Sequence, residues 1–257
     1  MATSTLINHK GAHIVEPAEL ALIKAPPPTE TWFPIAHSNV LESVRNALIG
    51  AGYQIQRQQL SVAHEGHRFF GTLDLTTRIN DEISLAVGIR NSTDKSFPIG
   101  WCCGQRVFVC DNLAFTSEIV IAKKHTRNGE TRYLEALARA VATLSTYKET
   151  AASWIARLQD WQISPQETDS LILRSYEKGL IGPRLLPDLI NEVRHPEHEQ
   201  FQGPMTGWKL WNCFTAVLRT MQEKQPSQAA LRTIRLQGLL TPPKEILDVE
   251  FNKVAAV

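Results

Sequence analysis

The spacing of the apolar residues changes once along this chain, near residue 128, and this change constrains the fold more than any other feature. Before it, apolar and polar residues alternate in several short segments, most clearly from Ile83 to Ile89, as is typical of half-buried strands. After it, apolar residues recur every three or four positions from Leu134 to Trp161, which is the spacing of an amphipathic helix. The sequence therefore predicts an α+β protein, with an antiparallel sheet in the N-terminal half packed against a helical C-terminal half.

Turn and cap signals divide the chain further. Residues 1–37 are expected to form an irregular N-terminal arm, because the prolines at 26–28 make a stiff extended stretch. Residues 38–240 are expected to form a single α+β domain, sheet-rich over 38–127 and helical over 128–240, followed by a C-terminal tail over 241–257. We expect the sheet over about 53–124 and helices over 39–50, 130–161, 165 to before 179, 184–195, 206–224 and from 227 toward 238.

The composition indicates a folded protein without a strong charge bias. Of the 257 residues, 43% are hydrophobic and 21% are charged, and the formal net charge is +1, which argues against a strongly basic nucleic-acid binder but leaves a local basic patch open. Apolar runs fall short of the roughly 20 residues of a membrane-spanning helix. With four cysteines and no evident signal peptide, we expect a cytoplasmic protein with reduced thiols and no membrane association. The sequence leaves homo-oligomer formation open.

Cations and aromatic residues are interleaved between residues 87 and 127. Lysine and arginine outnumber aspartate and glutamate there by six to three, and a single-stranded nucleic acid needs phosphate neutralisation together with base stacking. A solvated rim around core aromatics is the alternative, and for Trp101 we favour a core position because apolar and small residues flank it. The candidate nucleic-acid-binding residues are Arg90, Lys95, Arg106, Lys123, Lys124, His125 and Arg127.

A second group of polar residues is expected to lie near the edge of the sheet. Asp and Asn after a strand are ordinary turn formers, so we assign Asn91, Asp94 and Asn112 to a structural polar network. Arg106 is expected beside Asp94 and Asn112. Whether this group is a packing device or a site stays open at this point.

The sequence identifies no catalytic residue. It contains no nucleophile elbow, P-loop, dinucleotide-binding fingerprint or HExxH motif, and the cysteines and His125 lack the paired spacing of a structural zinc site. We therefore expect no metal and no cofactor, and a non-enzymatic role is favoured. Two alternatives stay open, namely a nuclease or hydrolase that uses loop acids or a cysteine, and a protein-interaction module.

Three segments, at 90–115, 123–126 and 208–219, give the chain a resemblance to the phage- and plasmid-associated family known as domain of unknown function 932. The chain departs from the family pattern at Lys95, where glycine is common, and at Cys102 and Cys103. The resemblance implies a mobile-element context in bacteria and no established reaction, so the favoured function is a phage- or plasmid-derived protein with single-stranded DNA as its candidate partner. The positions that match the family are Asn91, Ser92, Asp94, Arg106, Cys110, Asn112, His125, Thr126, Trp211, Asn212 and Thr215.

Overall fold

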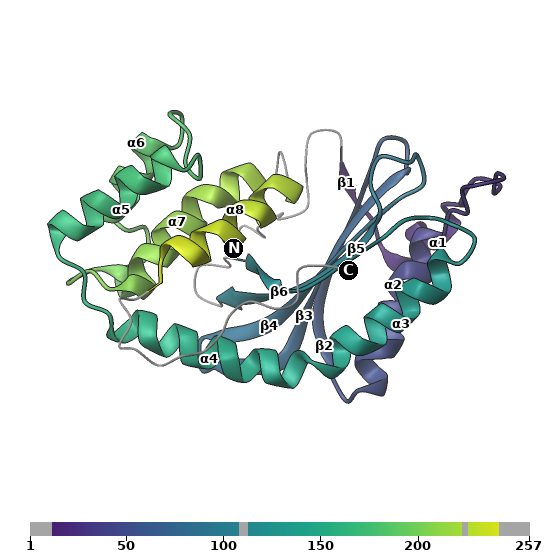
Figure 1. The fold of residues 1–257 in the computed structure, drawn as a ribbon, viewed down its shortest axis with the longest axis horizontal. Coiled ribbons are helices and arrows are strands. Elements are labelled where there is room, and N and C mark those ends of the chain that lie inside the picture. Colours follow the sequence, from purple (N-terminus) through teal and green to yellow (C-terminus); the bar gives the residue numbers. More distant parts are fainter. Residues whose placement is uncertain (1–11, 108–112, 223–225, 242–257) are drawn as a thin grey trace.

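The computed structural model of the protein describes residues 12–107, 113–222 and 226–241 (Figure 1). Six antiparallel strands form one sheet, and most of the helices follow it in the chain. The α+β prediction is therefore confirmed, with the sheet in the N-terminal half. None of the helices in these ranges is long and apolar enough to cross a membrane.

The strands are arranged in the sheet in the order in which they occur along the chain, so each strand pairs with its sequence neighbours. From β2 to β6 the connections are short, whereas the chain between β1 and β2 contains two helices. The expected sheet over about 53–124 matches the long strands. The strands are β1 (His13–Ile14), β2 (Ile55–Ala63), β3 (Arg68–Asn80), β4 (Ile83–Ser92), β5 (Ile99–Val107) and β6 (Leu113–Lys123).

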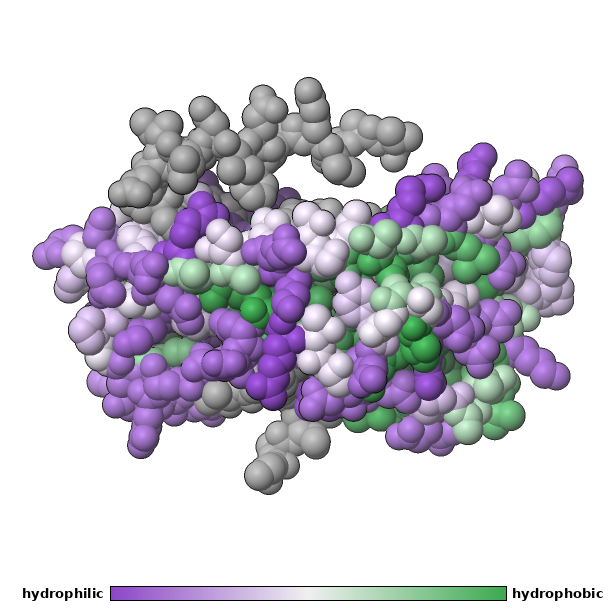
Figure 2. Space-filling view, turned by 90° about the horizontal axis from the view of Figure 1, so that it is seen from below, coloured by the Kyte–Doolittle hydropathy of each residue, from purple (hydrophilic) through white to green (hydrophobic). Residues whose placement is uncertain are grey.

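The two faces of the sheet differ in side-chain size. On one face Leu73, Val87 and Cys103 are fully buried and lie side by side across β3, β4 and β5. Helices α2 (His37–Gly50), α3 (Gly129–Ala142) and α4 (Leu144–Asp160) cover this apolar face (Figure 1). The other face carries small residues in β4, such as Ser84 and Ala86, which are also fully buried. Seen from below, the molecule is mostly hydrophilic, with hydrophobic patches between the hydrophilic residues (Figure 2).

The N-terminal arm contains regular structure, contrary to the prediction. Strand β1 pairs with β2, with His13 opposite Val62, and a short helix α1 (Pro17–Leu22) follows. At the start of α1, the Glu19 carboxylate accepts a hydrogen bond of 2.8 Å from the backbone N–H of Glu16. Both elements are too short to be stable alone, so they form only because the domain supplies their partners.

The long helix predicted over 130–161 is two helices, because α3 ends and α4 begins at Thr143. The Thr143 hydroxyl donates a 2.8 Å hydrogen bond to the carbonyl of Ala140, so a side chain competes with the helical backbone ladder at this position. The remaining helices follow the predictions within a few residues. They are α5 (Pro165–Glu177), α6 (Leu186–Arg194), α7 (Gly207–Gln222) and α8 (Pro226–Leu239). A short 3₁₀ helix that was not predicted, η1 (Glu199–Phe201), lies between α6 and α7.

Candidate nucleic-acid interface

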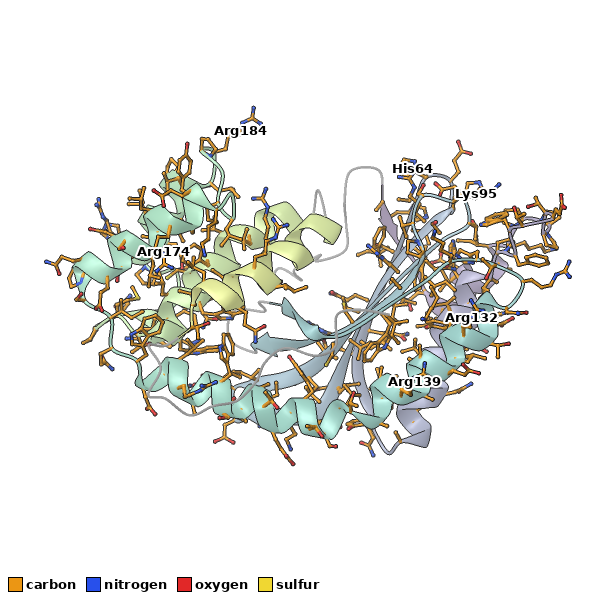
Figure 3. All side chains as sticks on the ribbon, viewed as in Figure 1. His64, Lys95, Arg132, Arg139, Arg174 and Arg184 are labelled. Atoms are coloured by element: carbon orange, nitrogen blue, oxygen red, sulfur yellow. The ribbon has the colours of Figure 1, made fainter. Side chains whose placement is uncertain are left out.

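Four segments that are far apart in the sequence meet at one end of the sheet. They are the segment 29–37 before α2, the β2–β3 turn at 64–67, the β4–β5 loop at 93–98 and the segment 123–129 after β6. The N–H of Thr93 donates to the carbonyl of His67 at 2.8 Å, and the N–H of Phe33 donates to the carbonyl of His125 at 2.9 Å. In Figure 3, His64 and Lys95 lie together at this end of the molecule. The structure therefore places the loop 90–96 and the basic segment 123–127 side by side, as expected.

Asn91 joins two of these segments from within the core. Its Nδ2 donates to the carbonyl of Ile35 and to Nδ1 of His37, both at 2.9 Å. His37 in turn donates from Nε2 to the carbonyl of Gly66 at 2.8 Å. Asn91 is fully buried, so its role is structural, because it fixes the segment before α2 against β4.

His125, a predicted nucleic-acid-binding residue, is buried and positions a neighbouring segment instead. Its exposed fraction is 5%, and its Nδ1 accepts a hydrogen bond of 3.3 Å from the N–H of Ile35. Burial disfavours the charged imidazolium and lowers the pKa of His125. The side chain is therefore neutral at physiological pH and anchors residues 33–35 to the end of β6.

Asp94 is paired with Arg68, not with Arg106. The Arg68 Nε lies 2.7 Å from the Asp94 carboxylate, whose other oxygen accepts a hydrogen bond from the Ser96 N–H at 3.0 Å. Burial acts to raise the pKa of Asp94, but the hydrogen bonds from Ser96 and the ion pair with Arg68 outweigh it and hold the pKa at about 2.

The strand register explains why the expected grouping of Asp94 with Arg106 does not occur. In the β4–β5 pair, Gly100 lies opposite Arg90 next to the loop, whereas Arg106 lies opposite Ser84 at the far end of both strands. Because β5 begins at Ile99, Arg106 lies near the end of the strand and not beside the loop. Asn112, the third member of the expected network, lies outside the described residues, as do Cys110 and Asp111.

Two exposed cations lie over two aromatic rings at this end of the sheet. The Lys95 ammonium lies 5.0 Å from the centre of the Trp32 ring, and the Arg127 guanidinium lies 5.7 Å from the centre of the Phe33 ring. Both rings are half-buried, and the Trp32 ring contacts His125 edge-on at 6.3 Å. Lys124 is exposed between the end of β6 and Arg127. We call Trp32, Phe33, Lys95, Lys124 and Arg127 the aromatic–basic surface.

Other predicted binding residues are less accessible. Arg90 is half-buried, with its guanidinium 5.5 Å from the centre of the Phe97 ring. Lys123 is half-buried in β6 opposite Ile99. Trp101 is 1% exposed, so the preferred core assignment for it is confirmed and it offers no face to a base. Trp32 and Phe33 were not among the predicted site residues, because only the folded chain brings them to Lys95 and Arg127.

The described cysteines are poorly suited to nucleophilic catalysis. Burial raises the pKa of the Cys102 and Cys213 thiols to about 12, so neither thiol ionises readily. Cys103 is fully buried in the core. No group of three or more histidine, cysteine or carboxylate side chains occurs in a metal-binding arrangement within the described ranges.

The C-terminal residues that carried the family resemblance are packing residues of α7. Trp211 is buried and contacts Trp154 edge-on, with ring centres 4.9 Å apart. Asn212 donates from Nδ2 to the carbonyl of Trp208 at 2.9 Å, and the Thr215 hydroxyl donates to the carbonyl of Asn212 at 3.1 Å. Trp211 therefore packs α7 against α4, whereas these hydrogen bonds of Asn212 and Thr215 lie within α7, and all three side chains are buried.

No protein-family model, curated protein or solved structure matches this chain. The resemblance to domain of unknown function 932 therefore rests on the sequence segments alone and stays a prediction.

Proposed function

We propose that this protein binds single-stranded nucleic acid at the aromatic–basic surface, in a non-enzymatic role of phage or plasmid origin. The observation that carries the proposal is the pair of cation–aromatic contacts, Lys95 with Trp32 and Arg127 with Phe33. Each contact places a phosphate-binding group beside a ring on which a base can stack, and single-strand binding combines these two elements. Asp94, the nearest acid of the β4–β5 loop, is already neutralised by Arg68.

Buried hydrogen bonds hold the segment that carries the two aromatic rings of this surface. His125, Asn91 and His37 fasten the segment with Trp32 and Phe33 to the sheet through buried hydrogen bonds. A preorganised platform loses less conformational entropy when a strand binds than a mobile loop would lose. The small net charge of +1 also fits a local patch better than a protein that coats DNA through overall charge.

Fluorescence anisotropy of labelled oligodeoxythymidylate, oligouridylate and a DNA duplex, each titrated with the full-length protein, tests the proposal. We expect binding to the single strands and weaker binding to the duplex, because stacking needs unpaired bases. Affinity should fall as salt rises from about 50 mM to about 200 mM. Absence of binding to every probe at low salt would refute the proposal and favour a protein-interaction module.

Two matched sets of variants separate phosphate contacts from stacking. Replacing Lys124 and Arg127 by Ala should flatten the log–log salt dependence by about 1.4, since each single-strand phosphate contact contributes about 0.7. Trp32→Ala should weaken binding by about 1–3 kcal/mol with little change in that slope. The control is the double replacement of Arg174 and Arg184 by Ala, which removes the same charge from exposed positions in the distant lobe of α5 and α6 (Figure 3). Equal effects of the two double variants would assign the binding to overall charge.

A further inference from the structure

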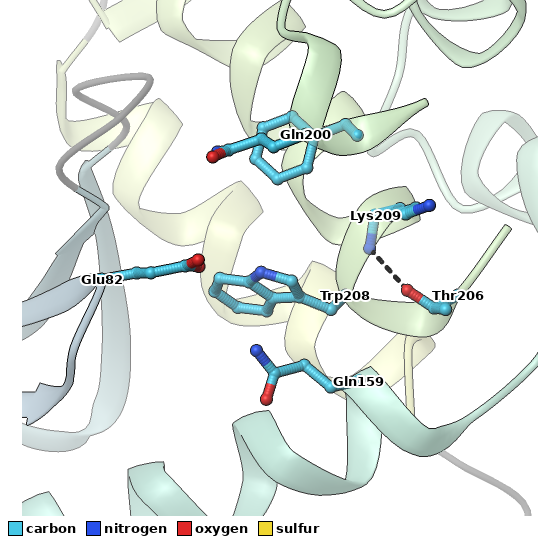
Figure 4. A pocket seen from close by; sticks show the side chains of 7 residues that line it. Glu82, Gln159, Gln200, Thr206, Trp208 and Lys209 are labelled. Atoms are coloured by element: carbon cyan, nitrogen blue, oxygen red, sulfur yellow. Dashed lines mark hydrogen bonds between the residues drawn. The ribbon is translucent and has the colours of Figure 1, made fainter. Parts of the chain in front are cut away.

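A pocket lies at the opposite end of the sheet from the aromatic–basic surface, where the β3–β4 turn approaches the helical half (Figure 4). Its volume is about 280 Å³, which is at the small end of ligand-binding cavities. Its lining residues come from the β3–β4 turn, the end of α4, η1 and the start of α7. They are Glu82, Gln159, Gln200, Phe201, Thr206, Trp208 and Lys209.

Backbone contacts hold the helical walls of this pocket together. Gln162 and Thr206 form an isolated bridge, and the N–H of Gly207 donates to the carbonyl of Trp161 at 2.9 Å. A Cβ atom at Gly207 would lie 2.7 Å from the Trp161 ring, so this close approach requires glycine. The pocket is therefore preformed by the packing of α4 against α7.

Trp208 presents a buried hydrogen-bond donor without an acceptor. The side chain is 4% exposed, and within the described part of the chain its Nε1 has no hydrogen-bond partner. Figure 4 shows the indole between Gln159 and Gln200, with the Glu82 carboxylate reaching toward its edge. A buried donor without a partner costs stability, and an acceptor atom of a ligand in the pocket would remove that cost.

Glu82 adds an unmatched negative charge to the same pocket. Its side chain is exposed, and its carboxylate makes no ion pair or hydrogen bond with another described residue. Lys209 also lines the pocket, but its ammonium donates to the carbonyl of Gln202 and points away from Glu82 in Figure 4. A ligand that brings a cation to Glu82 and an acceptor to Trp208 would give both groups a partner.

We propose that this pocket binds a small amine that carries hydroxyl groups beside its ammonium group, the chemistry of an amino sugar. The ammonium would pair with Glu82, and a neighbouring hydroxyl oxygen would accept from Trp208 Nε1. The amides of Gln159 and Gln200 can each donate and accept, so they suit the remaining hydroxyls, while Phe201 supplies an apolar wall for ring carbons. The volume suits one sugar ring. The site is independent of the proposed nucleic-acid surface, since it lies at the other end of the strands.

Indole N–H signals in a ¹⁵N–¹H spectrum of the full-length protein test the proposal, with Trp208 assigned by its disappearance in Trp208→Phe. The probes are glucosamine, glucose and glucuronate at mildly acidic pH and equal ionic strength, which share a ring and differ in charge. We expect a saturable shift of the Trp208 signal with glucosamine and no shift with the other two. No shift with glucosamine, or equal shifts with glucose or glucuronate, would overturn the proposal.

Matched variants test the role assigned to Glu82. Glu82→Gln should weaken glucosamine binding about tenfold, because the charge-assisted hydrogen bond is lost. Asp81→Asn removes the same charge from the adjacent exposed residue of the turn, which does not line the pocket, and should leave the affinity unchanged. Equal effects of the two variants would show that glucosamine responds only to the general charge of the turn, which also overturns the proposal.

Discussion

The side chain of Asn91 fixes the tautomer of His37. Its Nδ2 lies 2.9 Å from Nδ1 of His37, and since an amide nitrogen only donates, Nδ1 must be the accepting nitrogen. The proton of the neutral ring is then on Nε2, which donates to the carbonyl of Gly66 at 2.8 Å. This geometry leaves no acceptor for a proton on Nδ1, so the buried ring is held in its neutral form between β4 and the β2–β3 turn.

The first prediction concerns the free energy of unfolding of Asn91→Ala. The substitution leaves Nδ1 of His37 and the carbonyl of Ile35 buried without their donor, and each loss of this kind costs about 1–3 kcal/mol. We expect urea denaturation to show a destabilisation in this range or above it. Asn39→Ala, at an exposed position of α2, should change the free energy by less than about 0.5 kcal/mol. Equal effects of the two substitutions would contradict the buried network.

The second prediction concerns stability against pH. Burial is the largest influence on His37 and lowers its pKa from 6.5 to about 4. Because the unfolded state then binds more protons than the folded state, His37 contributes stability that is fully present above pH 6.5 and is lost as pH falls toward 4. The contribution is at most about 3–4 kcal/mol, from about 1.4 kcal/mol per pKa unit. Urea denaturation at several pH values should show this loss.

A variant isolates the contribution of His37 from that of His125, whose pKa burial also lowers. His37→Gln is less stable at neutral pH, but it should show a smaller slope of stability between pH 6.5 and pH 4. Asp94, whose pKa is lowered from 3.8 to about 2, loses its stabilising contribution only as pH falls below about 5, so the slope between pH 6.5 and pH 5 reports on the histidines. An unchanged slope in His37→Gln would mean that other groups govern the acid response.

The third prediction concerns the turn that carries Lys124 and Arg127. A Cβ atom at Gly129, the first residue of α3, would lie 2.5 Å from the carbonyl oxygen of Lys124, and a backbone atom cannot rotate away. Gly129→Ala should therefore destabilise the protein by about 1–3 kcal/mol, the usual cost of overpacking. Gly50→Ala at the end of α2 meets no atom within 4 Å and should be neutral or stabilising by up to about 1 kcal/mol. Thermal unfolding of both variants measures the contrast.

The sequence predicted helices and strands well where neighbouring residues in the chain supply the helix N-cap or alternate between apolar and polar. Ser164 accepts a hydrogen bond from the N–H of Glu167, and the Glu167 carboxylate accepts from the N–H of Ser164, so a capping box begins α5 at the predicted residue. Strand β1 and helix α1 were missed because they depend on β2 and the core. The break at Thr143 was missed because one hydroxyl interrupts an otherwise continuous apolar stripe.

The candidate site was harder to predict than the fold because its contacts join distant segments. The contact that turns His125 inward joins it to Ile35, 90 residues earlier in the chain. Trp32 and Phe33 lie just before Ile35, and contacts of this long-range kind bring their segment to Lys95 and Arg127. By contrast, Lys95, Lys124 and Arg127 lie beside segments whose alternation predicts strands, so their grouping at one end of the sheet followed from the sequence.

The last prediction tests the register that separates Asp94 from Arg106. The Arg68–Asp94 pair is 2.7 Å long, and its side chains are 30% and 23% exposed, so solvent screens it only in part. A double-mutant cycle of Arg68→Ala and Asp94→Ala, measured by urea denaturation, should give a coupling energy of about 0.5–1 kcal/mol. The cycle of Arg106→Ala with Asp94→Ala should give none, because β5 places these positions at opposite ends of the sheet. Coupling of Asp94 to Arg106 but not to Arg68 would contradict the β4–β5 register.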